Sequence, residues 1–149
     1  MKILETIRSK LLQIKASPAT ISKGYALGVF LGTTPLIGTK VFIALGLTSY
    51  LKWNRIASVI GVYHINILTA PAFYSVAFFI GKWVTGTNLV LQIPARLNLK
   101  SVFELFTSSP DVLLALTAGG IILGLPLAFI AYYFSYSILR NSNSHRRAF

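Results

Sequence analysis

The sequence has very few acidic residues. Only Glu5, Glu104 and Asp111 carry a carboxylate, and none lies between Lys15 and Arg96. This scarcity excludes a pair of carboxylates for acid–base catalysis and a carboxylate-ligated metal site. It also excludes the membrane-embedded carboxylate relay that is common in coupled transporters. We therefore expect the protein not to be an enzyme.

Cysteine is absent and histidine is scarce. The chain has 0 Cys and 2 His, so disulfides and thiolate chemistry are excluded. Two histidines without cysteines or nearby carboxylates supply too few ligands for a transition metal. We expect no catalytic residues, no bound metal and no cofactor.

Apolar residues are abundant. The chain is 54% hydrophobic and 11% charged, with a mean hydropathy of +0.69. The runs Ile56–Gly81 and Val112–Leu139 contain no charged residue, and each exceeds the roughly 20 apolar residues that cross a bilayer. A soluble, buried helical core is the alternative, but the chain has too little polar surface to cover one. We expect a multi-pass integral membrane protein.

Positive charges mark the ends of the apolar runs. Fourteen Lys or Arg residues give a net charge of +11, which is one signature of nucleic-acid binding. These cations do not form a patch, however, and their spacing fits contact with anionic lipid head groups at the membrane surface. We expect membrane lipids as partners and no nucleic acid. The cations that flank the runs are Lys15, Lys23, Lys52, Arg55, Lys82, Arg96, Lys100, Arg140, Arg146 and Arg147.

The chain forms a single membrane domain, 1–149, of helical segments. Apolar residues at helical spacing predict an interfacial helix over 2–15, and Ser17-Pro18 is typical of a helix start. The middle divides into two units that each contain a Thr- and Pro-bearing interruption and close in a Lys-Trp pair. The fold class expected is therefore all-α, with two broken-helix units, a C-terminal transmembrane helix and interfacial amphipathic helices. The remaining segments are the first unit at 17–53, the second at 54–83, a linker and interfacial helix at 85–109, the transmembrane helix at 110–140, and a basic tail at 141–149.

Two threadings of the first unit are open. Segments 18–34 and 37–51 are at or below the usual length for a crossing. They form either two short tilted spans or a re-entrant hairpin whose tip is the turn from Pro35 to Gly38. Paired broken helices of this kind are typical of membrane transport sites.

The interruptions carry the candidate binding residues. The turn over Thr33–Gly38 leaves backbone N–H groups free at a helix start, where anions bind, and Lys40 adds a full positive charge. The alternative for Lys40 is a lysine that snorkels to a nearby interface. His64 and Asn66 lie one turn before the expected break at Pro71, where hydrogen bonding to backbone groups is the alternative role. The predicted substrate-binding set is Lys40, Thr34, Pro35, Gly38, Thr39, His64, Asn66 and Thr69.

Small residues at every fourth position predict close helix packing. Gly24, Gly28 and Gly32 form one such stripe, and Gly120 and Gly124 form another on the last helix. Small residues at this spacing let a second backbone approach closely. We expect the two stripes to pack together, inside one chain or between protomers.

Three short sequence motifs resemble those of a known family. They are Gly24-Tyr-Ala-Leu-Gly-Val-Phe-Leu-Gly-Thr-Thr-Pro-Leu-Ile-Gly38, Asn54-Arg55-Ile-Ala57 and Asn66-Ile-Leu-Thr-Ala-Pro-Ala-Phe-Tyr74. Over roughly residues 17–84 the chain resembles the bacterial family catalogued as domain of unknown function 2062. One departure is Ile67, where the family usually has Pro after Asn. The resemblance implies a small protein of the bacterial cytoplasmic membrane, and similar domains are sometimes joined to glycosyltransferases.

Two functions follow as hypotheses. The first is a transporter or scramblase-like protein for an anionic lipid, either a polyprenyl phosphate or a phospholipid, with Lys40 neutralising the phosphate. At this chain length we expect a homodimer to enclose the path. The alternative is a non-catalytic membrane scaffold or anchor that positions an envelope glycosyltransferase through its glycine stripes.

Overall fold

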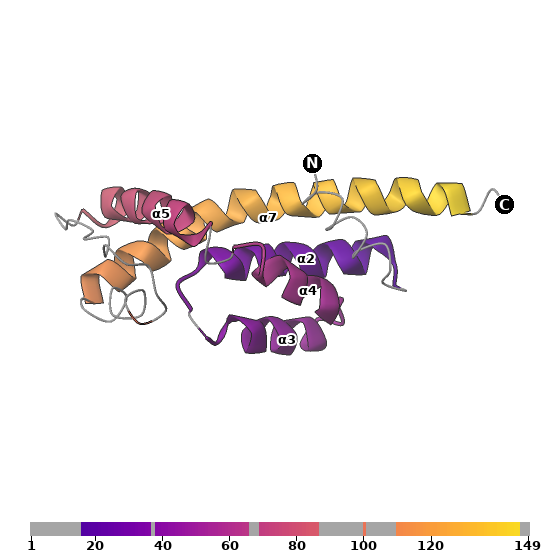
Figure 1. Ribbon diagram of the computed structural model, residues 1–149, viewed down its shortest axis with the longest axis horizontal. Helices are drawn as coiled ribbons and strands as arrows, with labels where there is room; N and C mark the ends of the chain where they lie inside the picture. The colour runs from indigo at the N-terminus through magenta and orange to yellow at the C-terminus, as the bar shows by residue number, and fades with distance from the viewer. Residues whose placement is uncertain (1–15, 37, 66–68, 87–99, 101–109, 147–149) are drawn as a thin grey trace.

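All of the regular secondary structure in the described part of the chain is helical. The computed structural model describes residues 16–36, 38–65, 69–86, 100 and 110–146. Its helices are α2 (Pro18–Thr33), α3 (Lys40–Tyr50), α4 (Arg55–Val62), α5 (Ala70–Thr85) and α7 (Pro110–Arg146) (Figure 1). The expected all-α class is confirmed for these residues. The expected interfacial helices over 2–15 and within 85–109 lie outside them, apart from Lys100.

The helix starts follow the capping residues in the sequence. The Ser17 hydroxyl accepts a hydrogen bond from the Thr20 amide at 3.4 Å, and the Asn54 side chain accepts one from the Ala57 amide at 2.8 Å. Both bonds satisfy amides that have no partner inside the helix. Asp111 lies in the first turn of α7, where its negative charge favours the positive end of the helix dipole.

Both apolar units are interrupted between two helices. In the first unit α2 ends at Thr33 and α3 begins at Lys40. In the second, α4 ends at Val62 and α5 begins at Ala70. The expected position of His64, one turn before the break, is wrong because α4 has already ended there. Pro71 lies in the first turn of α5, where its missing N–H costs nothing, so it begins a helix rather than interrupting one.

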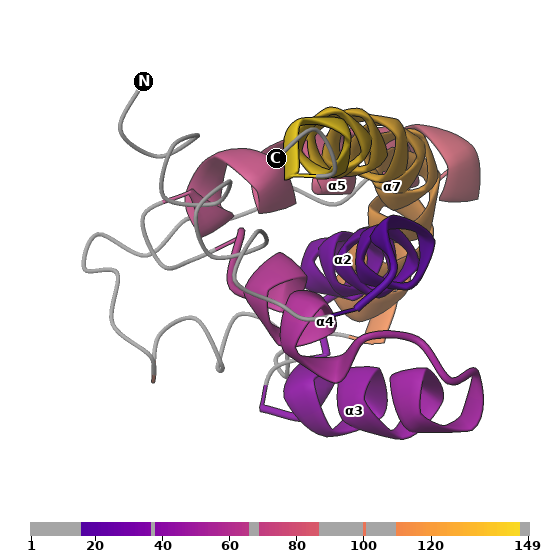
Figure 2. The ribbon, with the colours of Figure 1, turned by 90° about the vertical axis from the view of Figure 1, so that its right-hand side faces the viewer.

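The helices form layers along α7. Helices α2 and α5 both pack on α7, α4 packs on α2, and α3 packs on α4. Viewed along the long axis, α7, α2, α4 and α3 follow one another across the molecule (Figure 2). The second half of the first unit, α3, therefore lies against α4, and that of the second unit, α5, lies against α7.

The glycine stripe of α2 packs on α4. A methyl group added at Gly24 or Gly28 would overlap the carbonyl oxygens of Asn54 and Ser58. Gly120 lies against the carbonyl oxygen of Thr33. The expected pairing of the two glycine stripes is therefore wrong within the chain, because the glycine face of α2 already holds α4.

A different face of α2 meets α7. A methyl group at Gly124 would overlap the Thr33 hydroxyl. That hydroxyl shares its one hydrogen between the Gly120 carbonyl, at 2.9 Å, and the Phe30 carbonyl, at 2.7 Å. Because Gly120 and Gly124 have no side chains, the Thr33 hydroxyl can reach the α7 backbone.

The α5–α7 crossing depends on another pair of glycines. A methyl group at Gly81 would overlap the carbonyl oxygen of Ala115, and one at Gly119 would overlap that of Ala77. Reciprocal small residues let the two backbones touch. This pair was not among the glycines that the spacing had indicated.

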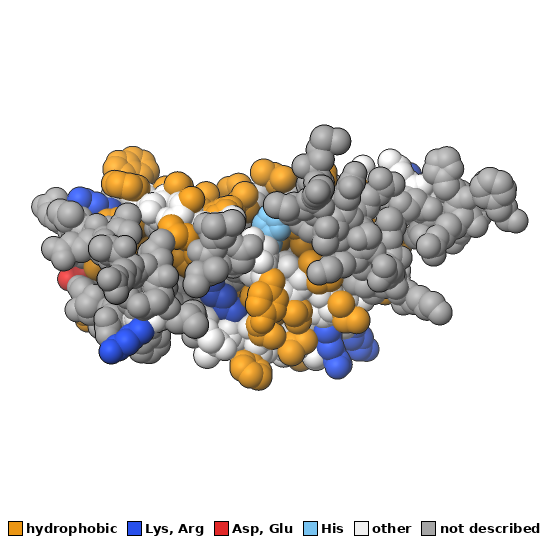
Figure 3. All heavy atoms as spheres, viewed as in Figure 1, with side chains coloured by type: hydrophobic (Ala, Val, Ile, Leu, Met, Phe, Trp, Pro, Cys, Tyr) orange, Lys and Arg blue, Asp and Glu red, His pale blue; other side chains and the backbone are white. Residues whose placement is uncertain are grey.

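Helix α7 is long, apolar and widely exposed. It runs to Arg146, so the helix continues into the expected tail at 141–149 instead of ending at 140. Among the described helices, one segment, Pro110–Asn141, is long and apolar enough to cross a membrane. Hydrophobic side chains gather in several patches on the described part of the face seen in Figure 3. The most exposed large ones are Phe42, Tyr50, Ile56, Tyr63, Phe79, Trp83, Phe129, Ile130 and Tyr133.

Candidate functional site

Lys40 lies where the two interrupted units meet. As the first residue of α3, it extends its ammonium back to the end of α2 and across to α5. Its Nζ donates to the Gly32 carbonyl at 2.8 Å and to the Tyr74 hydroxyl at 2.7 Å. The same Nζ is 5.3 Å from the centre of the Tyr74 ring, within the range of a cation–π contact.

Tyr74 completes the junction from the second unit. It lies on α5, just after the second interruption, and its hydroxyl donates to the Thr34 carbonyl at 3.5 Å. Gly32, Thr34 and Lys40 all belong to the first unit. A single cluster of side chains and backbone oxygens thus joins α2, α3 and α5 at their ends, and we call Lys40, Gly32, Thr34 and Tyr74 the junction cluster.

The charge at the junction cluster is positive and is half-buried. Lys40 is of intermediate exposure, and its hydrogen-bond partners among the described residues are neutral oxygens. The Gly32 carbonyl is in the last turn of α2, where the helix dipole favours a cation. An ammonium has three donors, so the two bonds leave one for a further acceptor.

The hydroxyls of Thr34 and Thr39, which were predicted for the site, form hydrogen bonds within their own segment. Thr34 Oγ1 donates to the Leu31 carbonyl at 2.7 Å, and Thr39 Oγ1 donates to the Leu36 carbonyl at 3.5 Å. Both hydroxyls therefore donate to a carbonyl three residues earlier, and Thr34 contributes to the junction cluster only through its carbonyl.

The other residues of the predicted set lie around the two turns. Pro35 is buried, Gly38 is exposed and Thr69 is half-buried beside the start of α5. Gly38 has a φ of 82°, which glycine adopts without the strain that other residues incur. Asn66 lies outside the described residues.

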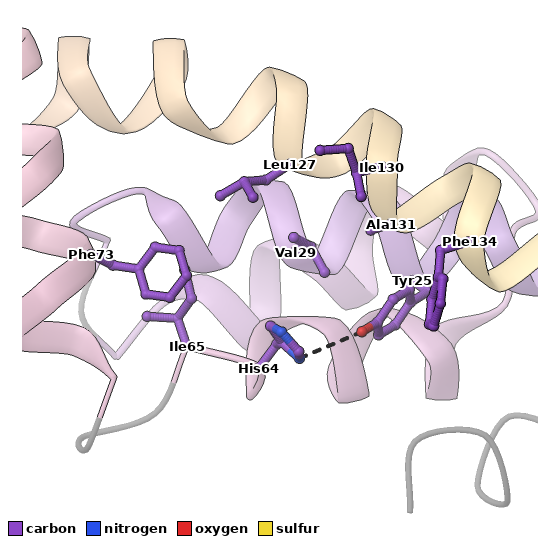
Figure 4. Close-up of a pocket in the computed structure, with 9 residues that line it drawn as sticks. All are labelled: Tyr25, Val29, His64, Ile65, Phe73, Leu127, Ile130, Ala131 and Phe134. Carbon is purple, nitrogen blue, oxygen red and sulfur yellow. Dashed lines mark hydrogen bonds between the residues drawn. The ribbon is translucent and has the colours of Figure 1, made fainter. Parts of the chain in front are cut away.

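His64 belongs to a second site. Its Nδ1 is 3.5 Å from the Tyr25 hydroxyl, and the two rings meet edge to face, with centroids 6.4 Å apart. They line a pocket of about 180 Å³ between α2, α5, α7 and the end of α4 (Figure 4). The remaining lining is Val29, Ile65, Phe73, Leu127, Ile130, Ala131 and Phe134. The structure therefore separates His64 from the hydrogen bonds of the junction cluster.

Two tyrosines of these sites were missed from the sequence. Tyr25 and Tyr74 lie in apolar stretches, where an aromatic residue is usually interpreted as a core residue or a lipid contact. The sequence signal that could have identified them is their position next to predicted features: Tyr25 follows Gly24 of the packing stripe, and Tyr74 comes three residues after Pro71. Both also lie within the motifs of the family resemblance, Tyr25 as the second residue of the first and Tyr74 as the last residue of the third.

Comparison with known proteins gives one match. A family model described as an uncharacterized protein conserved in bacteria (DUF2062) matches residues 1–148. No curated protein and no solved structure matches the chain. The match extends beyond residues 17–84, over which the sequence motifs had indicated the resemblance, and the chain belongs to this family.

Proposed function

We propose that this member of the DUF2062 family is a multi-pass protein of the bacterial cytoplasmic membrane that binds the phosphate of an anionic lipid at Lys40 and carries that lipid through the bilayer. The observation that carries the proposal is the half-buried Lys40 ammonium held between neutral oxygens at the meeting point of two interrupted units. Membrane transport sites are built at such interruptions.

Within the part of the chain that the structure describes, Lys40 has neutral oxygens and no carboxylate as hydrogen-bond partners, and a buried cation in an apolar protein is stabilised by an anion. A charged side chain inside a bilayer costs several kcal/mol unless it is paired or hydrated. No Asp or Glu lies between Lys15 and Arg96 to supply a counter-charge from this part of the chain. A lipid phosphate offers both the charge and several acceptors for charge-assisted hydrogen bonds.

The exposed apolar surface supports placing the protein in lipid. Exposed patches of this kind are rare in soluble monomers, and here they include aromatic residues on α3, α5 and α7. Trp83, at the end of α5, is 85% exposed, as suits the interfacial belt of tryptophans. In the proposal α7 crosses the bilayer, the two units enter it as re-entrant or short crossing pairs, and a homodimer encloses the path.

The scaffold alternative stays a second hypothesis. It assigns the glycine stripes to an external partner such as an envelope glycosyltransferase. Within the chain Gly24 and Gly28 lie against the α4 backbone, so such a partner would have to bind another surface.

Replacing Lys40 by methionine tests the proposal. The variant keeps a similar side-chain length but removes the charge and both hydrogen bonds. We expect at least tenfold weaker binding of phosphatidylglycerol and of a polyprenyl phosphate by native mass spectrometry, because a charged hydrogen bond contributes about 1.5–3 kcal/mol. Lipid scrambling by reconstituted vesicles should fall with it.

Lys52→Met is the matched control. Lys52 is exposed, and the substitution removes the same charge from the same fold. We expect unchanged lipid binding. Equal binding by the Lys40→Met variant and the wild-type protein would falsify the proposed role of the junction cluster.

Tyr74→Phe should have a smaller effect in the same direction. The ring stays beside the ammonium, but the hydroxyl that accepts from Lys40 at 2.7 Å is lost. Loss of one such bond is worth about 1 kcal/mol, so we expect about fivefold weaker phosphatidylglycerol binding in the same assay. An increase in affinity would instead mean that the hydroxyl competes with the phosphate for Lys40.

A further inference from the structure

The pocket around Tyr25 and His64 has one polar feature in an apolar lining. Seven of its nine lining residues are aliphatic, Phe or Ala. Its volume of about 180 Å³ is comparable with that of an engineered apolar cavity that takes up benzene. A short hydrocarbon segment would fit in this pocket. The Tyr25–His64 pair is the position in the lining at which a polar atom of a ligand could form a hydrogen bond.

The pair presents a hydrogen-bond donor whichever tautomer His64 adopts. If the Tyr25 hydroxyl donates to Nδ1, the histidine carries its hydrogen on Nε2. If Nδ1 donates instead, the tyrosine O–H is released. Each arrangement uses one hydrogen in the mutual bond and leaves one for a third group. The pocket thus suits a hydrocarbon that bears a single acceptor oxygen.

The pocket begins one helical turn from the junction cluster. On α2, Val29 lines the pocket and Gly32 accepts from Lys40, so three residues separate them, or about 4.5 Å of helix rise. On α5, Phe73 lines the pocket and the next residue, Tyr74, binds Lys40. A ligand whose phosphate is at Lys40 can therefore place the adjoining part of its chain in the pocket.

We propose that this pocket holds the acyl-ester region of a glycerophospholipid, with the Tyr25–His64 pair hydrogen-bonding an ester carbonyl. The inference rests on the proposed function and narrows its substrate class. A glycerophospholipid carries an ester carbonyl a few bonds from its phosphate and a hydrocarbon chain beyond it. A polyprenyl phosphate also carries a phosphate but has no acceptor in its chain, so it would leave the pair unused.

Ester-linked and ether-linked lipids separate the two cases. Dioleoyl phosphatidylglycerol and its dialkyl ether analogue have the same head group and charge, but only the first has carbonyl groups. We expect wild-type protein to bind the ester lipid about fivefold more tightly by native mass spectrometry, the effect of one hydrogen bond. In Tyr25→Phe and His64→Leu this preference should fall to nearly one.

The controls distinguish a failed inference from a failed function. Tyr63→Phe makes the same substitution at an exposed neighbour of His64 and should keep the preference. Lys40→Met should weaken both lipids equally. Equal binding of the two lipids by wild-type protein, or a preference that survives both pocket substitutions, overturns the inference. If Lys40→Met binds both lipids normally, the proposed function fails instead.

A polyprenyl phosphate serves as the third probe. Tighter binding of this lipid than of the ester lipid, unaffected by Tyr25→Phe, would also overturn the assignment while leaving the phosphate site at Lys40 intact. Tyr25 is buried, so circular dichroism of each variant must show the wild-type helical content. His64 is exposed, and its substitution provides the second test if Tyr25→Phe does not fold.

Discussion

Gly28→Leu should separate α4 from α2 and so destabilise the packing between the two units. Even a single Cβ at this position would overlap the Ser58 carbonyl and come within 2.9 Å of the Gly61 Cα. Both obstacles are backbone atoms, which cannot rotate away as a side chain can. A Cβ added at Gly61 would likewise overlap the Tyr25 carbonyl and lie 2.8 Å from the Val29 amide. The two backbones are therefore in contact, and neither helix can shift to make room for a side chain. We expect a loss of about 3 kcal/mol, seen as a lower midpoint of denaturation in detergent.

Gly46→Leu is the control for this substitution. Gly46 is also inside a helix, α3, but an added Cβ there has no atom within 4 Å. Because glycine is a poor helix former, this change should leave stability equal or raise it by up to about 1 kcal/mol. Equal destabilisation by both substitutions would mean that side-chain size, and not the α2–α4 contact, is responsible.

Gly119→Leu should displace α5 from α7 and disable lipid binding with it. Its added side chain would meet the Ala77 carbonyl and, at 2.8 Å, the Gly81 amide. Because α5 carries Tyr74, a shift of this helix also removes the hydroxyl that accepts from Lys40. We expect about 3 kcal/mol lower stability together with a loss of phosphatidylglycerol binding at least as large as that of Tyr74→Phe.

A second substitution on α7 controls for the new side chain. Ser137 is exposed on the same helix, and Ser137→Leu adds the same side chain where α5 does not pack. Stability and lipid binding should remain at wild-type values. A Gly119→Leu variant that melts normally but no longer binds lipid would show that α5 moves without cost, contrary to the packing in the structure.

Local signals in the sequence predicted where the helices begin. Ser17 and Asn54 act at short range, through a bond to an amide three residues later, so the residue type alone is informative. The interruption after α2 was equally readable from the Thr-Thr-Pro sequence. The second was placed too late, because Pro71 was read as the break when it is compatible with the first turn of a helix.

The sequence did not reveal which helices and side chains contact one another across the fold. A glycine stripe shows that something packs closely but not what, and α4, only eight residues long, was not an obvious partner for it. Lys40 was identified by its charge, whereas Tyr74 and Tyr25 were hidden among many aromatic residues. Their roles depend on contacts 34 and 39 residues apart in the chain, which no periodicity encodes.

The Lys40 ammonium forms hydrogen bonds with Gly32 at the end of α2, eight residues earlier in the chain, and with Tyr74 on α5. An incoming acceptor would take the third hydrogen of the ammonium, which the Gly32 carbonyl and the Tyr74 hydroxyl leave unused. In the proposed function, binding and the position of α5 beside α2 are then thermodynamically linked: a bound phosphate favours the arrangement that holds α2 and α5 together, and that arrangement favours the phosphate.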